Sequence, residues 1–338
     1  MRRREFITLL GGAAMASPVI ALAEQSQRDG EAQSGAKVWR IGFVEAGSVS
    51  VNRHFLDAFR QGMSELGYVE GRQLLIEERW ADGRRELFSS LLAEIIQLKV
   101  DIIVVSSSSG ALAARHATAT IPIVFVGPAD PVGEGLVASL ARPGRNMTGV
   151  SLAWDAQFYG KWVELLREVV PEVSRLGLLW SGGVSTGGAT VLKELEDLAR
   201  TQAVEIESFP VRALDEFDGA LAAMKQKRIG GLIVLPGPLT LRHRARVLDL
   251  TGQERIPAIY GFGEFARAGG LLAYGANPSE MFRRAATYVV KIFKGARAGE
   301  LPVEQPTKFE FVINLRAAKL LGLTLPPSLL ARADEVIE

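Results

Sequence analysis

The chain has 338 residues, 39 of them basic and 38 acidic, and it contains no cysteine. Nearly balanced charge leaves no electrostatic footprint for nucleic acid or for an anionic membrane surface. Without disulfides the fold must be stabilised by its core, and a hydrophobic content of 48% over this length is sufficient for that.

The first 23 residues have the pattern of an export signal. Arg3 and Arg4 precede an apolar run over residues 7–20, and Ala21-Leu22-Ala23 supplies a small-x-small cleavage site. The run is too short to span a bilayer, and the arginine pair followed by x-Phe-Ile resembles a twin-arginine signal. We expect residues 1–23 to be a twin-arginine signal peptide, residues 24–36 to be a flexible leader, and the mature protein to be soluble in the periplasm.

From residue 38 onward, short β-branched runs alternate with amphipathic segments of helical length, which predicts parallel sheets covered by helices. In chain order, the pattern gives a strand at 38–44, a helix near 52–66, a strand at 74–79, a helix near 84–98, a strand at 101–105, a helix at 111–117 and a strand at 121–126. The almost wholly apolar run at 101–105 is typical of a buried central strand.

The strand pattern then recurs. Residues 175–180, 231–235 and 256–260 repeat the runs containing Arg40, Ile102 and Pro122, at offsets of 135, 130 and 135. This spacing predicts two similar α/β lobes, one of residues 37–150 and 277–338 and the other of residues 151–276. The helix 280–293 and the strand 309–313 are expected to complete the first lobe, and the crossings near 143–150 and 271–278 to form a hinge beside a cleft.

Two segments resemble the substrate-binding proteins of ABC importers related to tryptophan and tyrosine binders. One is residues 121–149, with Asp130-Pro131-Val132 and Asn146-Met147-Thr148-Gly149, and the other is residues 314–326. The resemblance covers essentially the whole mature chain. It implies a two-lobed α/β fold of periplasmic-binding-protein type I, each lobe a parallel sheet flanked by helices and the two joined by a hinge. The chain departs from the family pattern at the Gly-rich loop 181–188, where an Asn-Pro type turn is more usual.

Open α/β sheets bind ligands beyond the carboxyl ends of their strands. There Ser106–Ser109 ends a strand and opens a helix, an arrangement suited to a ligand carboxylate; a plain helix cap is the alternative. Aromatic residues near the cleft can cover an apolar ligand or pack in the core. Asp130 and Glu264 can face a ligand ammonium, although Asp130 suits a helix cap slightly better. The predicted ligand contacts are Glu45, Ser48, Ser107, Ser108, Asp130, Trp154, Ser181, Pro236, Tyr260, Glu264 and Tyr274.

The leading interpretation is a non-enzymatic binding protein that captures a small carboxylated solute, an amino acid or an aromatic acid. We expect a monomer that docks on an ABC permease of the inner membrane and has no cofactor, metal or nucleic-acid partner. Two alternatives remain open. Residues 183–187 fit G-x-S-x-G, with Ser185 as the nucleophile of an exported esterase-like hydrolase, but only His243 follows as a base. A ligand-sensing module for a membrane receptor would use the same fold.

Overall fold

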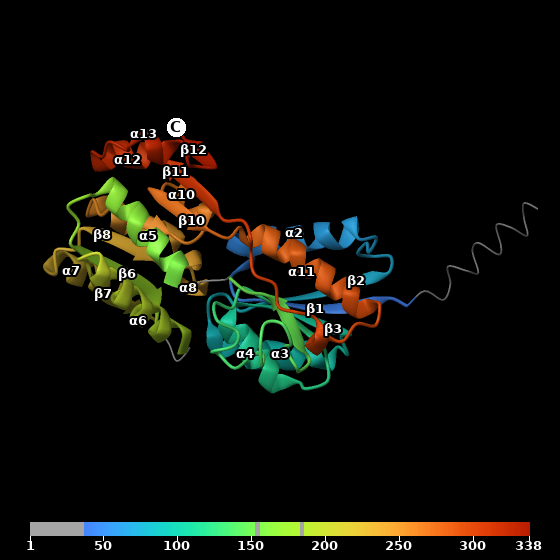
Figure 1. Ribbon diagram of the computed structural model, residues 1–338. Coiled ribbons are helices and arrows are strands. Elements are labelled where there is room, and N and C mark those ends of the chain that lie inside the picture. Colours follow the sequence, from blue (N-terminus) through green and yellow to red (C-terminus); the bar gives the residue numbers. More distant parts are fainter. Residues whose placement is uncertain (1–36, 153–155, 183–185) are drawn as a thin grey trace, which may run out of the picture. The chain divides into compact units, whose positions relative to one another are not determined.

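The structure is a computed structural model that describes residues 37–152, 156–182 and 186–338 (Figure 1). The expected signal peptide, the expected leader, Trp154 and Ser185 lie outside the described residues. Within those described ranges, no helix is both long enough and apolar enough to cross a membrane.

The first lobe is built on five parallel strands in the order β2-β1-β3-β4-β5. They are β1 (Trp39–Glu45), β2 (Leu74–Trp80), β3 (Ile102–Ser106), β4 (Ile123–Val126) and β5 (Met147–Val150). Helices α2 (Val49–Glu65) and α11 (Pro278–Phe293) lie on one face, and α3 (Phe88–Gln97) and α4 (Ser107–Ala117) lie on the other (Figure 1). A short 3₁₀ turn, η1 (Arg85–Leu87), precedes α3.

The central strand β3 shows why this lobe has two cores. Ile102 and Val104 are buried in the cluster that contains the side chains of α2 and α11. Ile103 and Val105 are buried in the cluster that contains those of α3 and α4. Successive side chains of a strand point to opposite faces, and here both faces are covered by helices. The strand is therefore apolar at every one of these positions.

Helix α11 packs along α2 although more than 200 residues separate them in the chain. Gly62 permits the close approach, because a Cβ at that position would lie 2.7 Å from the carbonyl oxygen of Arg283 and 2.9 Å from Cβ of Ala286. Arg283 Nη2 also lies 2.7 Å from Glu65 Oε2. The chain thus returns to the first lobe after it has built most of the second.

The second lobe repeats the strand order of the first. Its strands β7-β6-β8-β9-β10 are parallel neighbours, in the same arrangement as β2-β1-β3-β4-β5. They are β6 (Arg175–Ser181), β7 (Glu205–Val211), β8 (Gly231–Val234), β9 (Ala258–Tyr260) and β10 (Leu272–Gly275). The repeat predicted from the sequence is therefore confirmed, with β6, β8 and β9 in the places of β1, β3 and β4.

Two further strands extend this sheet beyond β10, namely β11 (Glu310–Asn314) and β12 (Glu335–Ile337). The helices of this part of the chain are α5 (Ala156–Val169), α6 (Thr186–Thr201), α7 (Glu216–Gln226), α8 (Pro238–Arg242), α9 (Arg244–Gln253), α10 (Gly263–Arg267), α12 (Leu315–Leu321) and α13 (Pro327–Leu330). The 3₁₀ turn η2 (Ala298–Glu300) follows α11 and contacts β5.

One expectation about the lobes is wrong. The strand expected at 309–313 does not complete the first lobe, because β11 pairs antiparallel with β10, with Leu272 opposite Ile313 and Tyr274 opposite Phe311. Proteins usually pair or cover the edges of their sheets. Here β11 pairs with the edge of β10, whereas the edge of β5 that faces away from β4 has, among the described residues, a single bridge between Val150 and Glu304. Three segments therefore pass between the lobes, after β5, after β10 and before β11.

Candidate functional site

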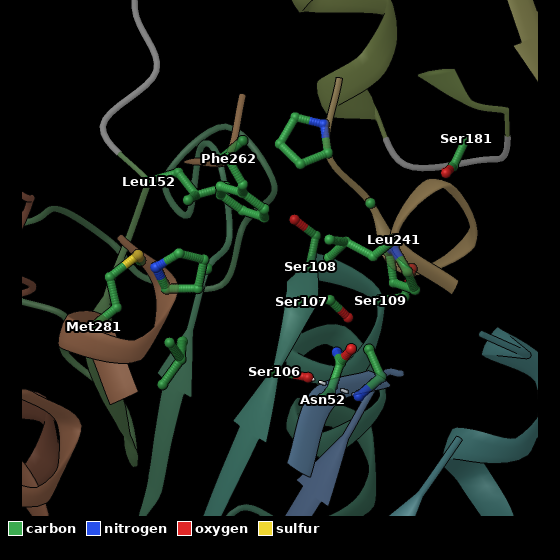
Figure 2. Close-up of a pocket in the computed structure, with 18 of the residues that line it drawn as sticks. Asn52, Ser106, Ser107, Ser108, Ser109, Leu152, Ser181, Leu241, Phe262 and Met281 are labelled. Carbon is green, nitrogen blue, oxygen red and sulfur yellow. Dashed lines mark hydrogen bonds between the residues drawn. The ribbon is translucent and has the colours of Figure 1, made fainter. Parts of the chain in front are cut away.

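A cavity of about 210 Å³ lies at the carboxyl ends of strands from both sheets. Glu45, Ser106 and Val126 reach it from β1, β3 and β4, and Ser181 and Leu235 reach it from β6 and the residue after β8. Figure 2 shows the serines of the first lobe at the base of this space, with Phe262, Leu152 and Met281 around it. The larger apolar side chains of its wall are Phe55, Leu152, Trp180, Leu241, Phe262, Met281 and Phe282.

The polar part of the wall is acidic. Its side chains are those of Glu45, Asn52, Ser106, Ser107, Ser108, Ser109, Glu134 and Ser181. No lysine, arginine or histidine lines the cavity within the described residues. Any charge on a ligand is thus met by two carboxyl groups and by neutral donors and acceptors.

The turn from β3 into α4 presents the serines. Ser106 Oγ accepts a hydrogen bond from the amide of Ala46 at 2.7 Å, and Ser107 Oγ accepts one from the amide of Gly110 at 3.2 Å. Ser107 has a φ of +67°, in the left-handed region that a non-glycine residue adopts at a cost. Such strain is concentrated at functional sites, and here it turns the chain so that Ser108 faces the cavity (Figure 2).

The hydroxyl of Ser108 is already committed to a protein carboxylate. It donates a 2.7 Å hydrogen bond to Glu134 Oε1. The second oxygen, Glu134 Oε2, is buried and makes no hydrogen bond within the described part of the chain. Burial raises the pKa of Glu134, and the hydrogen bond from Ser108 offsets part of that rise.

Glu45 repeats this pattern on the neighbouring strand. Its Oε1 accepts from Asn52 Nδ2 at 2.9 Å and from the amide of Gly47 at 3.2 Å. Its Oε2 is buried and has no hydrogen-bond partner among the described residues. The side chain is only 2% exposed, and this burial raises the pKa of Glu45 more than its hydrogen bonds lower it. The serine turn is therefore flanked by two carboxyl groups, which disfavours it as the place for a ligand carboxylate.

The second lobe contributes a neutral wall. Ser181 Oγ is buried and makes no hydrogen bond within the described ranges, and it faces Gly237, where an added Cβ would lie 2.8 Å from that hydroxyl. Pro236 lines the cavity next to Gly237. Trp180 lines it as well, while its indole Nε1 donates to Ser208 Oγ at 2.9 Å. Among the described residues, Ser181 is thus an unpaired hydroxyl contributed by the lobe that does not carry the two carboxyl groups.

Five of the predicted contacts line the cavity, and five other predicted residues that the structure describes do not. Those that line it are Glu45, Ser107, Ser108, Ser181 and Pro236. Ser48 and Asp130 lie elsewhere, because their side chains serve local structure. Ser48 precedes α2, with its Oγ 3.1 Å from Ser50 Oγ. Asp130 Oδ1 accepts from the amide of Gly133 at 2.8 Å and closes a turn instead of capping a helix.

The two tyrosines expected at the cleft are packing residues. Tyr260 is 1% exposed, stacks on Phe265 with ring centroids 4.8 Å apart, and has its hydroxyl 3.0 Å from Thr251 Oγ1. Tyr274 packs against Phe158 and Phe309, with centroids 5.5 and 5.8 Å apart. Both rings are thus engaged in aromatic packing, and neither residue lines the cavity.

Glu264 is also removed from the cavity, because it is engaged in ion pairs. Its Oε1 lies 3.0 Å from His54 Nε2 and its Oε2 lies 3.3 Å from Arg244 Nη1. Sequence reasoning missed Glu134 and Asn52. Asn52 stood as a polar residue on the apolar face of an expected helix, and Glu134 stood in the segment 121–149 that carries the family resemblance. Neither position in the sequence indicated which residue the side chain of Asn52 or Glu134 would contact.

Two lobes of equal strand order, with a cavity at the strand ends, define a solute-binding protein of the periplasmic type. The chain belongs to the ABC transporter substrate binding protein family, whose sequence profile matches residues 41–337. It is 25% identical over 265 residues to a tyrosine-binding protein of Clostridioides difficile, covering 78% of this chain and 75% of the relative.

Two solved structures share the fold. One is a conserved domain protein of Vibrio cholerae (TM-score 0.83, 24% identity, 89% of this chain and all of that one). The other is an ABC domain from Streptococcus pneumoniae in complex with L-Trp (TM-score 0.82, 24% identity, 88% and 99%). The family is one of solute-binding proteins and not of enzymes, which removes support from the hydrolase alternative. The ring of His243, the one histidine that follows Ser185 in the sequence, lies edge-on to Phe217 with centroids 6.1 Å apart.

Proposed function

We propose that this protein is the solute-binding component of an ABC importer and that its ligand is a small amino acid. The observation that carries the proposal is the cavity at the strand ends, with its apolar wall and its few polar groups. The tyrosine-binding relative and the neighbour in complex with L-Trp support an amino acid as the class of ligand.

The cavity favours a zwitterion over an aromatic acid. Its volume of about 210 Å³ lies below the roughly 300–1,000 Å³ of sites for drug-sized molecules, so the ligand is small. Phe262, Leu152 and Met281 suit an apolar side chain. An aromatic acid would bring only negative charge beside Glu45 and Glu134, whereas an amino acid also brings an ammonium group. Its carboxylate would then lie at the Ser181 hydroxyl of the second lobe, away from the carboxyl groups.

The transport role further requires export and a partner in the membrane. We place the mature protein in the periplasm, delivered by a twin-arginine signal peptide over residues 1–23, and docking as a monomer on a permease of the inner membrane. The paired arginines, the short apolar run and the Ala-Leu-Ala site support export, and the family supports the permease.

Calorimetric titration of the purified mature protein with the twenty amino acids tests the ligand class. We expect one or a few apolar amino acids to bind with one-to-one stoichiometry. Phe262→Ala should weaken this binding, while Leu320→Ala, a change at a side chain 77% exposed and outside the cavity, should leave it unchanged. Mass spectrometry of solutes that copurify with the protein gives an independent result. If no amino acid binds and no solute copurifies, the proposal is wrong.

A further inference from the structure

The cavity is lined by two buried carboxyl groups, and among the described residues each keeps one oxygen without a hydrogen-bond partner. Glu45 and Glu134 each anchor one oxygen, through Asn52 and Ser108, and leave Oε2 buried without a hydrogen bond in the described part of the protein. Buried polar atoms are nearly always paired, because an unpaired one costs the desolvation of that group. Two such atoms in the wall of one cavity indicate groups that a ligand completes.

The charge of the wall shows what kind of ligand completes them. The described lining has no basic side chain to balance the two carboxyl groups. Glu45 is 2% exposed and Glu134 is 9% exposed, so water screens neither of them well. A ligand cation gains from both charges, whereas a ligand carboxylate placed there is opposed by both.

We propose that Glu45 and Glu134 form a cation subsite that binds a protonated amine of the ligand, and that a ligand carboxylate is dispensable. The inference rests on the proposed function, since it takes this cavity to be the ligand site. An ammonium has three N–H donors, which matches in number the two carboxyl groups and one serine of the turn. The ligand class becomes small apolar amines, of which amino acids are the zwitterionic members.

Matched probes separate the amine from the carboxylate. L-Tryptophan carries both groups, tryptamine carries only the amine, and indole-3-propionate carries only the carboxylate. The pairs phenethylamine with 3-phenylpropionate and isoamylamine with 4-methylvalerate repeat the comparison with smaller apolar bodies. By calorimetry at neutral pH, we expect at least one amine to bind and each acid to bind at least about tenfold more weakly than its matched amine.

Variants then test the two residues. Glu45→Gln and Glu134→Gln should each weaken the binding of the best amine by at least about tenfold. Glu172→Gln, at an exposed carboxyl outside the cavity, is the matched control and should change nothing. Without ligand, neither cavity variant should lower the melting temperature, because each removes a buried and incompletely paired charge. A purely structural role would instead lower it and leave the preference for amines intact.

Three outcomes overturn the inference: an acid that binds more tightly than its matched amine, glutamine variants that bind amines as well as the parent does, or a complete absence of amine binding. Binding of acids alone would leave the proposed solute-binding function standing. Failure of the copurification and amino-acid experiments, in contrast, overturns the proposed function itself.

Discussion

The imidazole Nε2 of His54 lies 3.0 Å from Glu264 Oε1, and this contact joins α2 of the first lobe to α10 of the second. A second contact joins the lobes through other residues, where Arg242 Nη1 is 2.9 Å from Asp82 Oδ2. The hydrogen bond that Glu264 accepts from His54 raises the pKa of His54, and partial burial offsets some of that rise. Two ion pairs thus connect the lobes independently of the cavity residues.

The first prediction concerns the protonation of His54. Its pKa is raised above 6.5, while burial lowers the pKa of His243, so NMR titration should find His54 protonated to higher pH than His243. Because the pKa of His54 is raised in the folded protein, the contact contributes its full stabilisation below about pH 6.5. That stabilisation is lost as the pH rises through the folded pKa. Glu264→Gln should lower the pKa of His54, and an unchanged pKa would show that the contact does not form in solution. The effect on stability should be small, since His54 is about half exposed.

The second prediction follows from the raised pKa values of Glu45 and Glu134. In the unfolded chain these carboxyl groups have a pKa near 4.5, so they ionise at a lower pH than they do in the folded protein. The ligand-free protein should therefore lose stability as the pH rises from about 4.5 through the folded pKa values of Glu45 and Glu134. The charge of Asp130 adds to the rise at Glu134. Binding of tryptamine should show the opposite trend, with affinity increasing over the same interval. Calorimetry in buffers of different ionisation enthalpy should detect proton release within that interval, and uptake of protons would contradict the prediction.

The third prediction tests where a ligand carboxylate binds. Ser181→Ala removes the hydroxyl of the second lobe that has no partner within the described ranges, and a hydrogen bond to a charged group contributes roughly 1.5–3 kcal/mol. If L-tryptophan binds, its affinity should fall about tenfold or more in this variant, while tryptamine should bind as before. Equal losses for both ligands would show that Ser181 does not contact the carboxylate.

A fourth prediction concerns Gly149, which has a φ of +152° in β5. A Cβ at this position would collide with the carbonyl oxygen of Phe125 on the neighbouring strand β4. Gly149→Ala should therefore lower the free energy of unfolding by about 1–3 kcal/mol or more, measured by urea denaturation. Gly252→Ala is the matched control, because that exposed position in α9 has no atom within 4 Å of an added Cβ. The control should be neutral or stabilising by up to about 1 kcal/mol.

The fifth prediction separates packing from binding at Tyr260. Thr251 Oγ1 donates to the carbonyl oxygen of Leu248, so the Tyr260 hydroxyl donates to Thr251. Tyr260→Phe should cost about 0.5–1.5 kcal/mol of stability and leave ligand affinity unchanged. A large loss of ligand affinity without a loss of stability would show instead that Tyr260 contacts the ligand.

The sequence alone determined the α/β class, the repeated lobes and the strand ends where the cavity lies. These features depend on local periodicity and on apolar runs such as residues 101–105, which keep their meaning whatever packs against them. Glu45 and Ser181 were found by the same reasoning, because each ends a strand that a hydrophobic pattern identifies.

The tertiary structure decided which polar groups meet. Glu134 follows no regular strand, yet the fold places it 2.7 Å from Ser108 and converts an apparent anion site into an acidic wall. Strand β11 has an ordinary strand pattern, and only its pairing with β10 assigns it to the second lobe. Tyr260 and Tyr274 point into packed rings for a similar reason. Contacts between residues far apart in the chain depend on how elements pack, and the periodicity of one segment carries no information about its partner.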